Sequence, residues 1–178
     1  MKQAKVFVTM DISGSMGTRK KNKAKEYYLN FKSLLDNVYE SIETVFIAHT
    51  TVARFSNEEE MFISGESGGT FLSSGLELVK QSKLCDGDNF LIIFSDGDNW
   101  GEDNDLFINS VNDLLNSFTN IFYVEVKSAT YVSSVLERLY KIENKNLDLK
   151  MINPYDDNND FLCELQDILR FFDKMKII

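Results

Sequence analysis

The run Asn89–Phe94 (N-F-L-I-I-F) constrains the fold most, because it is apolar at five consecutive positions. A strand with one face in water alternates apolar and polar residues, whereas an unbroken apolar run is typical of a strand buried on both faces. Such a strand requires helices on both sides of its sheet. The chain has 178 residues, enough for one domain, spanning 1–178, with a sizeable core.

Strand-like and helix-like segments alternate along the rest of the chain. Apolar, β-branched and aromatic runs predict strands at Lys5–Met10, Glu43–Thr50, Thr51–Phe55, Ile121–Val126 and Leu147–Ile152. Helical spacing of apolar residues predicts helices at Thr18–Tyr39, Phe71–Leu84, Leu106–Phe118, Tyr131–Ile142 and Phe161–Met175, with one helical turn at Asn57–Ile63. The alternation predicts an α/β fold with a mostly parallel central sheet, one antiparallel edge strand (Thr51–Phe55) and helices on both faces.

Bulk properties narrow the classes of function. The net charge of −9 disfavours nucleic acid or an acidic membrane as the main partner and is compatible with cation binding. Cys85 and Cys163 are far apart without a CxxC motif, so free thiols are expected rather than a disulfide or a zinc site. No apolar run is long enough to span a membrane, and the N-terminus enters a strand directly, so we expect a cytoplasmic protein.

The segment Met10–Gly17 (M-D-I-S-G-S-M-G) follows the first predicted strand and precedes a helix. Asp11, Ser13 and Ser15 stand at alternate positions, and Gly14 permits a tight turn that can bring them together. A carboxylate and two hydroxyls are hard oxygen ligands, suited to Mg²⁺, Mn²⁺ or Ca²⁺ rather than to Zn²⁺ or copper. Taken alone, the segment fits a Ser-capped helix start equally well.

Two further loops carry the same kind of ligand. The glycine-rich loop Ser64–Thr70 ends in a threonine, and the acidic loop that begins at Ser95 contains Asp96 and Asp98. In open α/β sheets the loops after the strands gather at one edge, where ligands bind. We therefore expect these side chains to meet the first loop at a cation site.

The residues just described resemble those of von Willebrand factor A domains. D-I-S-G-S at Asp11–Ser15 matches that family's D-x-S-x-S motif, and Thr70 and Asp96 match the other two positions of its metal-ion-dependent adhesion site. The resemblance spans essentially the whole chain and implies a Rossmann-like fold.

The resemblance also implies a role for each position. Ser13 and Ser15 resemble direct ligands of Mg²⁺ or Mn²⁺, and Thr70 resembles a ligand whose contact changes between open and closed states. Asp11 and Asp96 resemble carboxylates that hold metal-bound waters. One coordination position is left for an Asp or Glu of a protein partner, so the resemblance implies a metal-dependent interaction module without enzymatic activity.

A narrower resemblance rests on three strings: H-T-T at His49–Thr51, G-E-S-G-G-T at Gly65–Thr70, and S-D-G-D-N-W-x-E-D-N at Ser95–Asn104. These look like the YhbH-like family of bacterial sporulation and stress-response proteins. Members usually carry a long charged N-terminal region, which this sequence lacks. The resemblance implies association with a serine protein kinase and a SpoVR-type protein.

The alternative from the residues alone is an enzyme. Asp96 and Asp98 form a D-G-D pair that, with Asp11, could hold Mg²⁺ in a phosphohydrolase or nuclease. Against this, no nucleophile–base pair stands at a fixed spacing.

Several residues keep two interpretations. For Asp98, Glu102, Asp103 and Asp105, a solvated acidic loop and helix N-terminus is favoured over a second cation site. Glu66 either reaches the metal edge or faces water, and Trp100 is either a contact anchor or packs over its loop. The lone His49 is expected to be structural. The basic start of the helix at Thr18–Tyr39 is expected to be a solvated face rather than a patch for an acidic partner.

Overall fold

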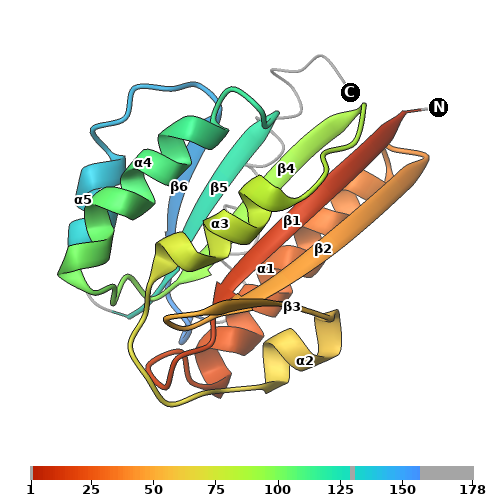
Figure 1. Ribbon diagram of the computed structural model, residues 1–178. Coiled ribbons are helices and arrows are strands. Elements are labelled where there is room, and N and C mark those ends of the chain that lie inside the picture. Colours follow the sequence, from red (N-terminus) through yellow and green to blue (C-terminus); the bar gives the residue numbers. More distant parts are fainter. Residues whose placement is uncertain (1, 129–130, 157–178) are drawn as a thin grey trace.

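The computed structural model describes residues 2–128 and 131–156. These residues form a six-stranded sheet in the order β3-β2-β1-β4-β5-β6, with helices on both faces (Figure 1). The strands are β1 (Gln3–Asp11), β2 (Ser41–His49), β3 (Ala53–Ser56), β4 (Asp88–Ser95), β5 (Asn120–Val126) and β6 (Leu147–Ile152). The helices are α1 (Thr18–Asp36), α2 (Glu58–Ile63), α3 (Leu72–Gln81), α4 (Asn104–Leu114) and α5 (Ser134–Leu139), with a 3-10 turn, η1 (Gly101–Asp103), before α4.

The pairing of the strands confirms the predicted sheet. β1 pairs in parallel with β2 and β4, the pairs β4–β5 and β5–β6 are also parallel, and only β3 of the described strands is antiparallel to its neighbour. After β1 the chain continues to β2, which lies on one side of β1, whereas β4 lies on the other side of β1. This reversal places a topological switch point between β1 and β4, the position where α/β sheets bind ligands. Met10 pairs with Phe94, so Asp11 and Asp96 leave neighbouring strands.

Some element bounds differ from those predicted. The helix expected at Tyr131–Ile142 extends only over Ser134–Leu139, because the Ser133 side chain accepts the backbone N–H of Leu136 and starts the helix there. The closing helix expected at Phe161–Met175 lies outside the described residues. None of the helices within the described ranges is long and apolar enough to cross a bilayer.

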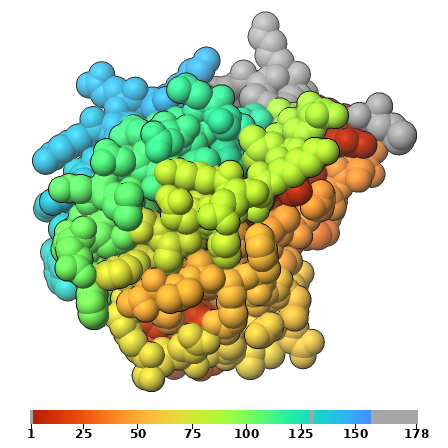
Figure 2. Space-filling view, viewed as in Figure 1, coloured from red at the N-terminus to blue at the C-terminus, as the bar shows by residue number. Residues whose placement is uncertain are grey.

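The face of the sheet that carries α3, α4 and α5 has its own hydrophobic core. Side chains of the strands pack there against the apolar sides of these helices, among them Phe7, Ile47, Leu91, Ile93, Leu76 and Phe107. Figure 2 shows this face closed by the helices, with little of the strands visible. Towards the carboxyl ends of the strands the same face turns polar, with Thr9, Asp11, His49, Ser95 and Glu125 all buried.

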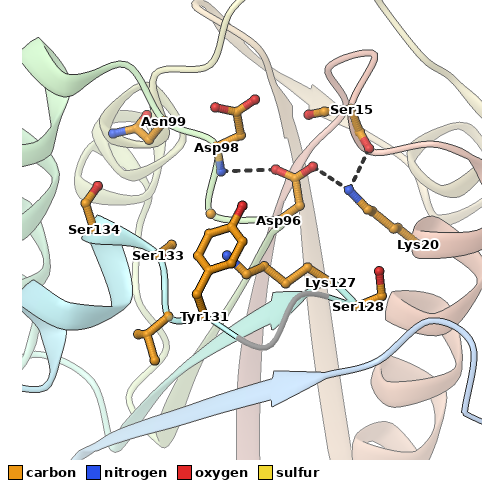
Figure 3. A pocket seen from close by; sticks show the side chains of 12 residues that line it. Ser15, Lys20, Asp96, Asp98, Asn99, Lys127, Ser128, Tyr131, Ser133 and Ser134 are labelled. Carbon is orange, nitrogen blue, oxygen red and sulfur yellow. Dashed lines mark hydrogen bonds and ion pairs between the residues drawn. The ribbon is translucent and has the colours of Figure 1, made fainter.

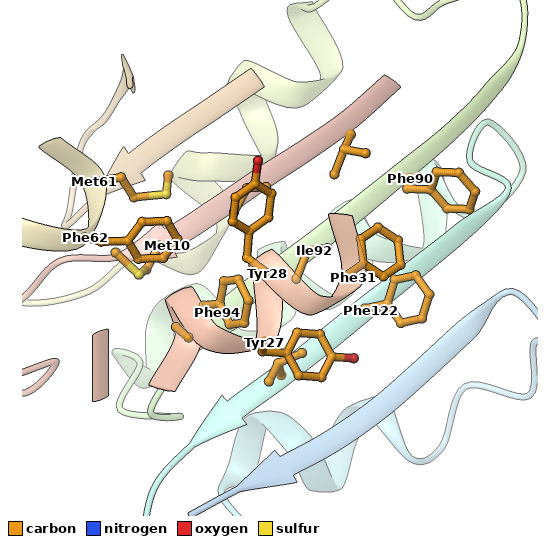
Figure 4. Packing of buried hydrophobic residues seen from close by; sticks show 14 of the residues in the cluster. Met10, Tyr27, Tyr28, Phe31, Met61, Phe62, Phe90, Ile92, Phe94 and Phe122 are labelled. Atoms are coloured by element: carbon orange, nitrogen blue, oxygen red, sulfur yellow. The ribbon is translucent and has the colours of Figure 1, made fainter. Parts of the chain in front are cut away.

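The opposite face is covered by α1 and α2 and is rich in aromatic rings (Figure 4). Phe31 of α1 is fully buried, and its ring meets Phe122 at 5.1 Å and Phe90 at 5.7 Å between centroids, both edge to face. Such contacts add to the free energy gained by removing the rings from water. They hold α1 firmly on the sheet, and the start of α1 in turn borders the loop that follows β1.

Replacing Phe31 tests this core. Phe31→Ala should lower the free energy of unfolding by about 3–5 kcal/mol, because it leaves a cavity among rings that cannot close on it. Leu29→Ala, on the exposed side of α1, is the matched control and should cost less than about 1 kcal/mol. Urea denaturation measures both, and equal losses would show that the α1 face is not packed as described.

Candidate metal centre

Asp11 organises the loops at the carboxyl end of the sheet. It is the last residue of β1 and is fully buried. Its Oδ1 accepts the backbone N–H of Ser13 at 2.8 Å, and its Oδ2 accepts the hydroxyl of Thr70 at 3.2 Å. One carboxylate therefore fastens the loop after β1 to the glycine-rich loop before α3, and brings together residues 59 positions apart.

Ser13 and Ser15 present their hydroxyls side by side and joined by a hydrogen bond, with the two Oγ atoms 3.1 Å apart. Two neighbouring ligands of an octahedral Mg²⁺, each at about 2.1 Å from the ion, lie about 3.0 Å apart. The separation is thus close to the one that two metal-bound hydroxyls require. All the side-chain donors here are hard oxygens, so the residues present fit a small divalent cation.

The glycine-rich loop lies against the first loop through Glu66. Its backbone N–H donates to the carbonyl of Ile12 at 2.9 Å, and it forms an isolated bridge with Ser13. Its carboxylate pairs with Arg54 of β3 at 2.6 Å. The side chain is exposed, as the second interpretation from the sequence expects, and in addition its carboxylate is bound to a neighbouring strand.

Asp96, directly after β4, is held from two sides. Its Oδ1 accepts the backbone N–H of Asp98 at 3.1 Å, and its Oδ2 accepts the ammonium of Lys20 at 2.7 Å. The same ammonium donates to the carbonyl of Ser15 at 2.9 Å (Figure 3). Lys20 thereby connects Asp96 to the loop that carries the two serines.

The predicted residues open onto two adjoining cavities. Ser13, Ser15 and Thr70 line one of about 360 Å³, with Asp11 buried beneath them. Asp96 lines the other, of about 590 Å³ (Figure 3). Ser15 and Asp98 line both cavities. The remaining walls of the smaller cavity are Gly14, Ser67, Gly68, Gly69 and Trp100.

The electrostatics of Asp11 favour a cation. Burial raises the pKa of Asp11 to about 6, and the negative charge of Asp96 adds to the rise. Hydrogen bonds from Ser13 and Thr70 oppose it only in part. A buried carboxylate with a raised pKa lacks full compensation of its charge. A cation held above it would supply that compensation.

The start of α1 is not the solvated basic face that the sequence favoured. Lys21 and Lys23 are buried, and the Lys21 ammonium donates to the carbonyl of Ser64 on the glycine-rich loop. Burial lowers the pKa of Lys21, an effect that the charge of Asp11 opposes. Sequence reasoning missed these contacts because a lysine can bury its long apolar stem while its charged head reaches a polar partner.

The acidic loop after β4 caps α3, which the sequence did not predict. Asp103 is buried, and its carboxylate accepts the Ser73 backbone N–H at 3.0 Å and also the Ser73 hydroxyl. Asn99 accepts the backbone N–H of Leu72 at 3.0 Å and donates to Asp103 at 3.2 Å. These are the donors that every helix start leaves unpaired. Asp103 therefore belongs neither to a solvated loop nor to a second cation site.

Trp100 closes the contact between the acidic and glycine-rich loops. Its backbone N–H donates to the carbonyl of Thr70 at 3.2 Å, and its ring meets Phe71 edge to face at 5.4 Å. A Cβ on Gly69 would lie 2.2 Å from the ring, so only glycine fits there. The side chain is still 51% exposed at the cavity rim. Trp100 therefore packs over the loop, as one interpretation from the sequence expects, and its role as a contact anchor stays a prediction.

A buried polar group supports the turn that follows Asp96. Gly97 has a φ of +80°, and a Cβ there would lie 2.6 Å from the Glu125 carboxylate. Glu125 is fully buried, accepts the hydroxyls of Ser133 and Tyr123, and pairs with Lys127 at 3.0 Å. Packing against Glu125 therefore accounts for the glycine of the S-D-G string.

His49 lies outside both cavities. It is fully buried at the end of β2, where its ring would meet a Cβ on Gly75 at 2.9 Å. Burial lowers the pKa of His49 to about 4, against the opposing effect of the Thr50 backbone. The ring is therefore neutral near pH 7 and packs as a structural residue, but neither of its nitrogens has a hydrogen-bond partner within the described part of the chain.

The enzyme alternative depends on which carboxylates and hydroxyls line the two cavities. Asp98 lines the same cavity as the serines, as that alternative requires. Within residues 2–128 and 131–156, however, no group of three or more His, Cys, Asp or Glu side chains is placed to hold a metal ion. The ligands that converge are mostly hydroxyls. A centre built from Asp11, Asp96 and Asp98 stays a prediction.

Residues 1–170 match the family model described as "Protein of unknown function (DUF444)". The chain belongs to the DUF444 family. A UPF0229 protein of Ruminiclostridium cellulolyticum is 39% identical over 162 residues, which cover 86% of this chain and 41% of that protein. One from Thiobacillus denitrificans is 40% identical over 135 residues, 71% of this chain and 32% of that protein. This DUF444 domain spans about two fifths of such relatives.

Solved structures share the fold of this DUF444 domain. BatB of Bacteroides thetaiotaomicron superimposes with a TM-score of 0.63 at 12% identity, covering 94% of this chain and 99% of that one. Proximal thread matrix protein 1 of the mussel byssus, with a zinc-occupied MIDAS motif, gives 0.64 at 14% identity, covering 96% and 46%. At these identities the likeness is one of fold, and it confirms the von Willebrand factor A-like architecture.

The cap on α3 gives a testable prediction. Asp103→Ala should lower the free energy of unfolding by about 1–3 kcal/mol, because it leaves the buried donors of Ser73 without an acceptor. Asp105→Ala is the matched control, since the Asp105 side chain is 84% exposed in a surface ion pair. It should change stability by less than about 1 kcal/mol. If both aspartates behave alike in urea denaturation, Asp103 does not cap α3.

Proposed function

We propose that this domain is a metal-dependent protein-interaction module. Mg²⁺, or Mn²⁺ in its place, would bind the hydroxyls of Ser13, Ser15 and Thr70 and bridge them to an Asp or Glu of a partner protein. The observation that carries the proposal is the 3.1 Å separation of the Ser13 and Ser15 Oγ atoms, above the buried Asp11 and beside a cavity that opens to solvent.

The proposed ligands explain why the ion would attract a carboxylate from a partner. The three hydroxyls are neutral, and Asp11 and Asp96 would act through metal-bound waters. A divalent ion held mainly by neutral ligands keeps most of its charge. It therefore attracts a carboxylate from outside the domain. Trp100, half-exposed at the rim, would supply apolar contact around that carboxylate.

Both the solved structures and the curated relatives support the proposal. The mussel protein, which shares the fold, holds zinc at its MIDAS motif, and the D-I-S-G-S, Thr70 and Asp96 positions of this chain match such a motif. The curated relatives are bacterial. On the resemblance to YhbH-like proteins, we propose that the module acts in sporulation or stress response in the cytoplasm. On that resemblance, its partners would be a serine protein kinase or a SpoVR-type protein.

The second candidate is a Mg²⁺-dependent phosphohydrolase or nuclease using Asp11, Asp96 and Asp98. The position of Asp98 on the cavity wall favours it. Mg²⁺-dependent hydrolysis of a generic phosphate ester by the wild type, abolished in Asp98→Asn, would establish this candidate in place of the first.

Titration with Mn²⁺ and Mg²⁺ tests the leading proposal. The wild type should bind one equivalent saturably, and Asp11→Asn and Ser13→Ala should each weaken binding at least tenfold, because each removes an oxygen that holds the ion directly or through water. Isothermal titration calorimetry measures the affinity.

The matched controls for this titration lie on the exposed side of α1. Asp36→Asn and Ser33→Ala make the same chemical changes away from the cavities and should leave the affinity within about twofold of the wild type. No saturable binding by the wild type, or equal binding by Asp11→Asn and Asp36→Asn, would contradict the proposal.

A further inference from the structure

Lys20 holds a position that the metal-site pattern does not account for. It lies in the first turn of α1, and its ammonium is 2.7 Å from Asp96 Oδ2 and 2.9 Å from the carbonyl of Ser15 (Figure 3). It therefore contacts both the carboxylate proposed to act on the metal through water and the main chain of a proposed ligand. Among the ion pairs of the described residues, this is the one that engages a predicted site carboxylate.

This ion pair is partly shielded from water. The Asp96 side chain is 4% exposed and that of Lys20 is 26% exposed, so water screens their attraction only partly. The other Asp96 oxygen already accepts the backbone N–H of Asp98. With the ammonium in place, each carboxylate oxygen of Asp96 has a hydrogen-bond donor.

Neighbouring lysines do not share this role. Lys21 donates to the neutral carbonyl of Ser64. Lys127 pairs with the buried Glu125, and its ammonium lies 4.4 Å from the centre of the Tyr131 ring. Each is committed to a partner outside the predicted ligand set.

We propose that Lys20 is an internal cation that competes with the divalent ion for this site. The inference rests on the proposed function. An ion bound to the Ser13 and Ser15 hydroxyls would stand close to the ammonium that touches the Ser15 carbonyl, and like charges at such range repel. The metal binds when Lys20 releases Asp96, and the adjoining cavity of about 590 Å³, which Lys20 itself lines, gives the ammonium room to move.

The competition has two consequences for the domain. Without metal, Lys20 neutralises Asp96 and holds the loops near their ligand positions, so the site keeps its shape. With metal, the affinity is lower than the oxygen ligands alone would give, because binding must displace the ammonium. Removing the charge of Lys20 should therefore tighten metal binding and destabilise the metal-free protein.

The experiment compares Mn²⁺ affinity by calorimetry with thermal unfolding in EDTA. Lys20→Met should bind Mn²⁺ at least fivefold more tightly than the wild type and should unfold at a lower temperature in EDTA. Lys20→Arg, which keeps the charge, should bind no more tightly than the wild type. Lys32→Met, which removes an exposed lysine from the same helix, is the matched control and should stay within twofold in affinity.

Failure of this inference is distinguishable from failure of the proposed function. If the wild type binds Mn²⁺ but Lys20→Met binds equally or more weakly, the competition is overturned and the metal site stands. If neither binds, both are overturned. If Lys20→Met does not fold, Lys20→Gln replaces it, with the same expected gain in affinity and the same criterion for rejection.

Discussion

The buried carboxylate of Asp11 is the group on which the rest of the site depends. Taking a carboxylate out of water is unfavourable unless hydrogen bonds or a cation compensate its charge. Here the compensation comes from the Ser13 backbone N–H and the Thr70 hydroxyl. The same two contacts join the loop after β1 to the loop before α3. The raised pKa of Asp11 shows that compensation within the chain is incomplete, which is the physical reason to expect a cation there.

Around this carboxylate, each loop is held by contacts that do not bind the ligand. Asp103 and Asn99 cap α3, and Trp100 packs over Gly69, so the acidic loop fixes the glycine-rich loop. Such preorganisation lets weak, neutral hydroxyl ligands form a site, because little ordering is left to occur when an ion binds. The site is therefore both shaped in advance and open on one side.

The sequence predicted the fold and the composition of the site better than the contacts that support it. Unbroken apolar runs and helical spacing identified the alternating strands and helices, and the loops after β1 and β4 carry Asp11 and Asp96 as expected. Lys20 and Asp103 were missed because their partners lie 76 and 30 residues away. From the neighbouring sequence alone, a lysine or an aspartate is predicted to lie on the surface. The partners of these two residues come close to them only in the folded chain. The same limit explains why Glu66 was left between two interpretations, neither of which included Arg54.

Diffraction from crystals grown with Mn²⁺ would test the central claim most directly, because the anomalous signal locates the ion without assumptions about its ligands. The account predicts one strong peak above Asp11, at about 2.2 Å from the Oγ atoms of Ser13 and Ser15, with the Lys20 ammonium moved away from Asp96. A peak between the carboxylates of Asp96 and Asp98 and away from the serines, or no peak at saturating Mn²⁺, would contradict it.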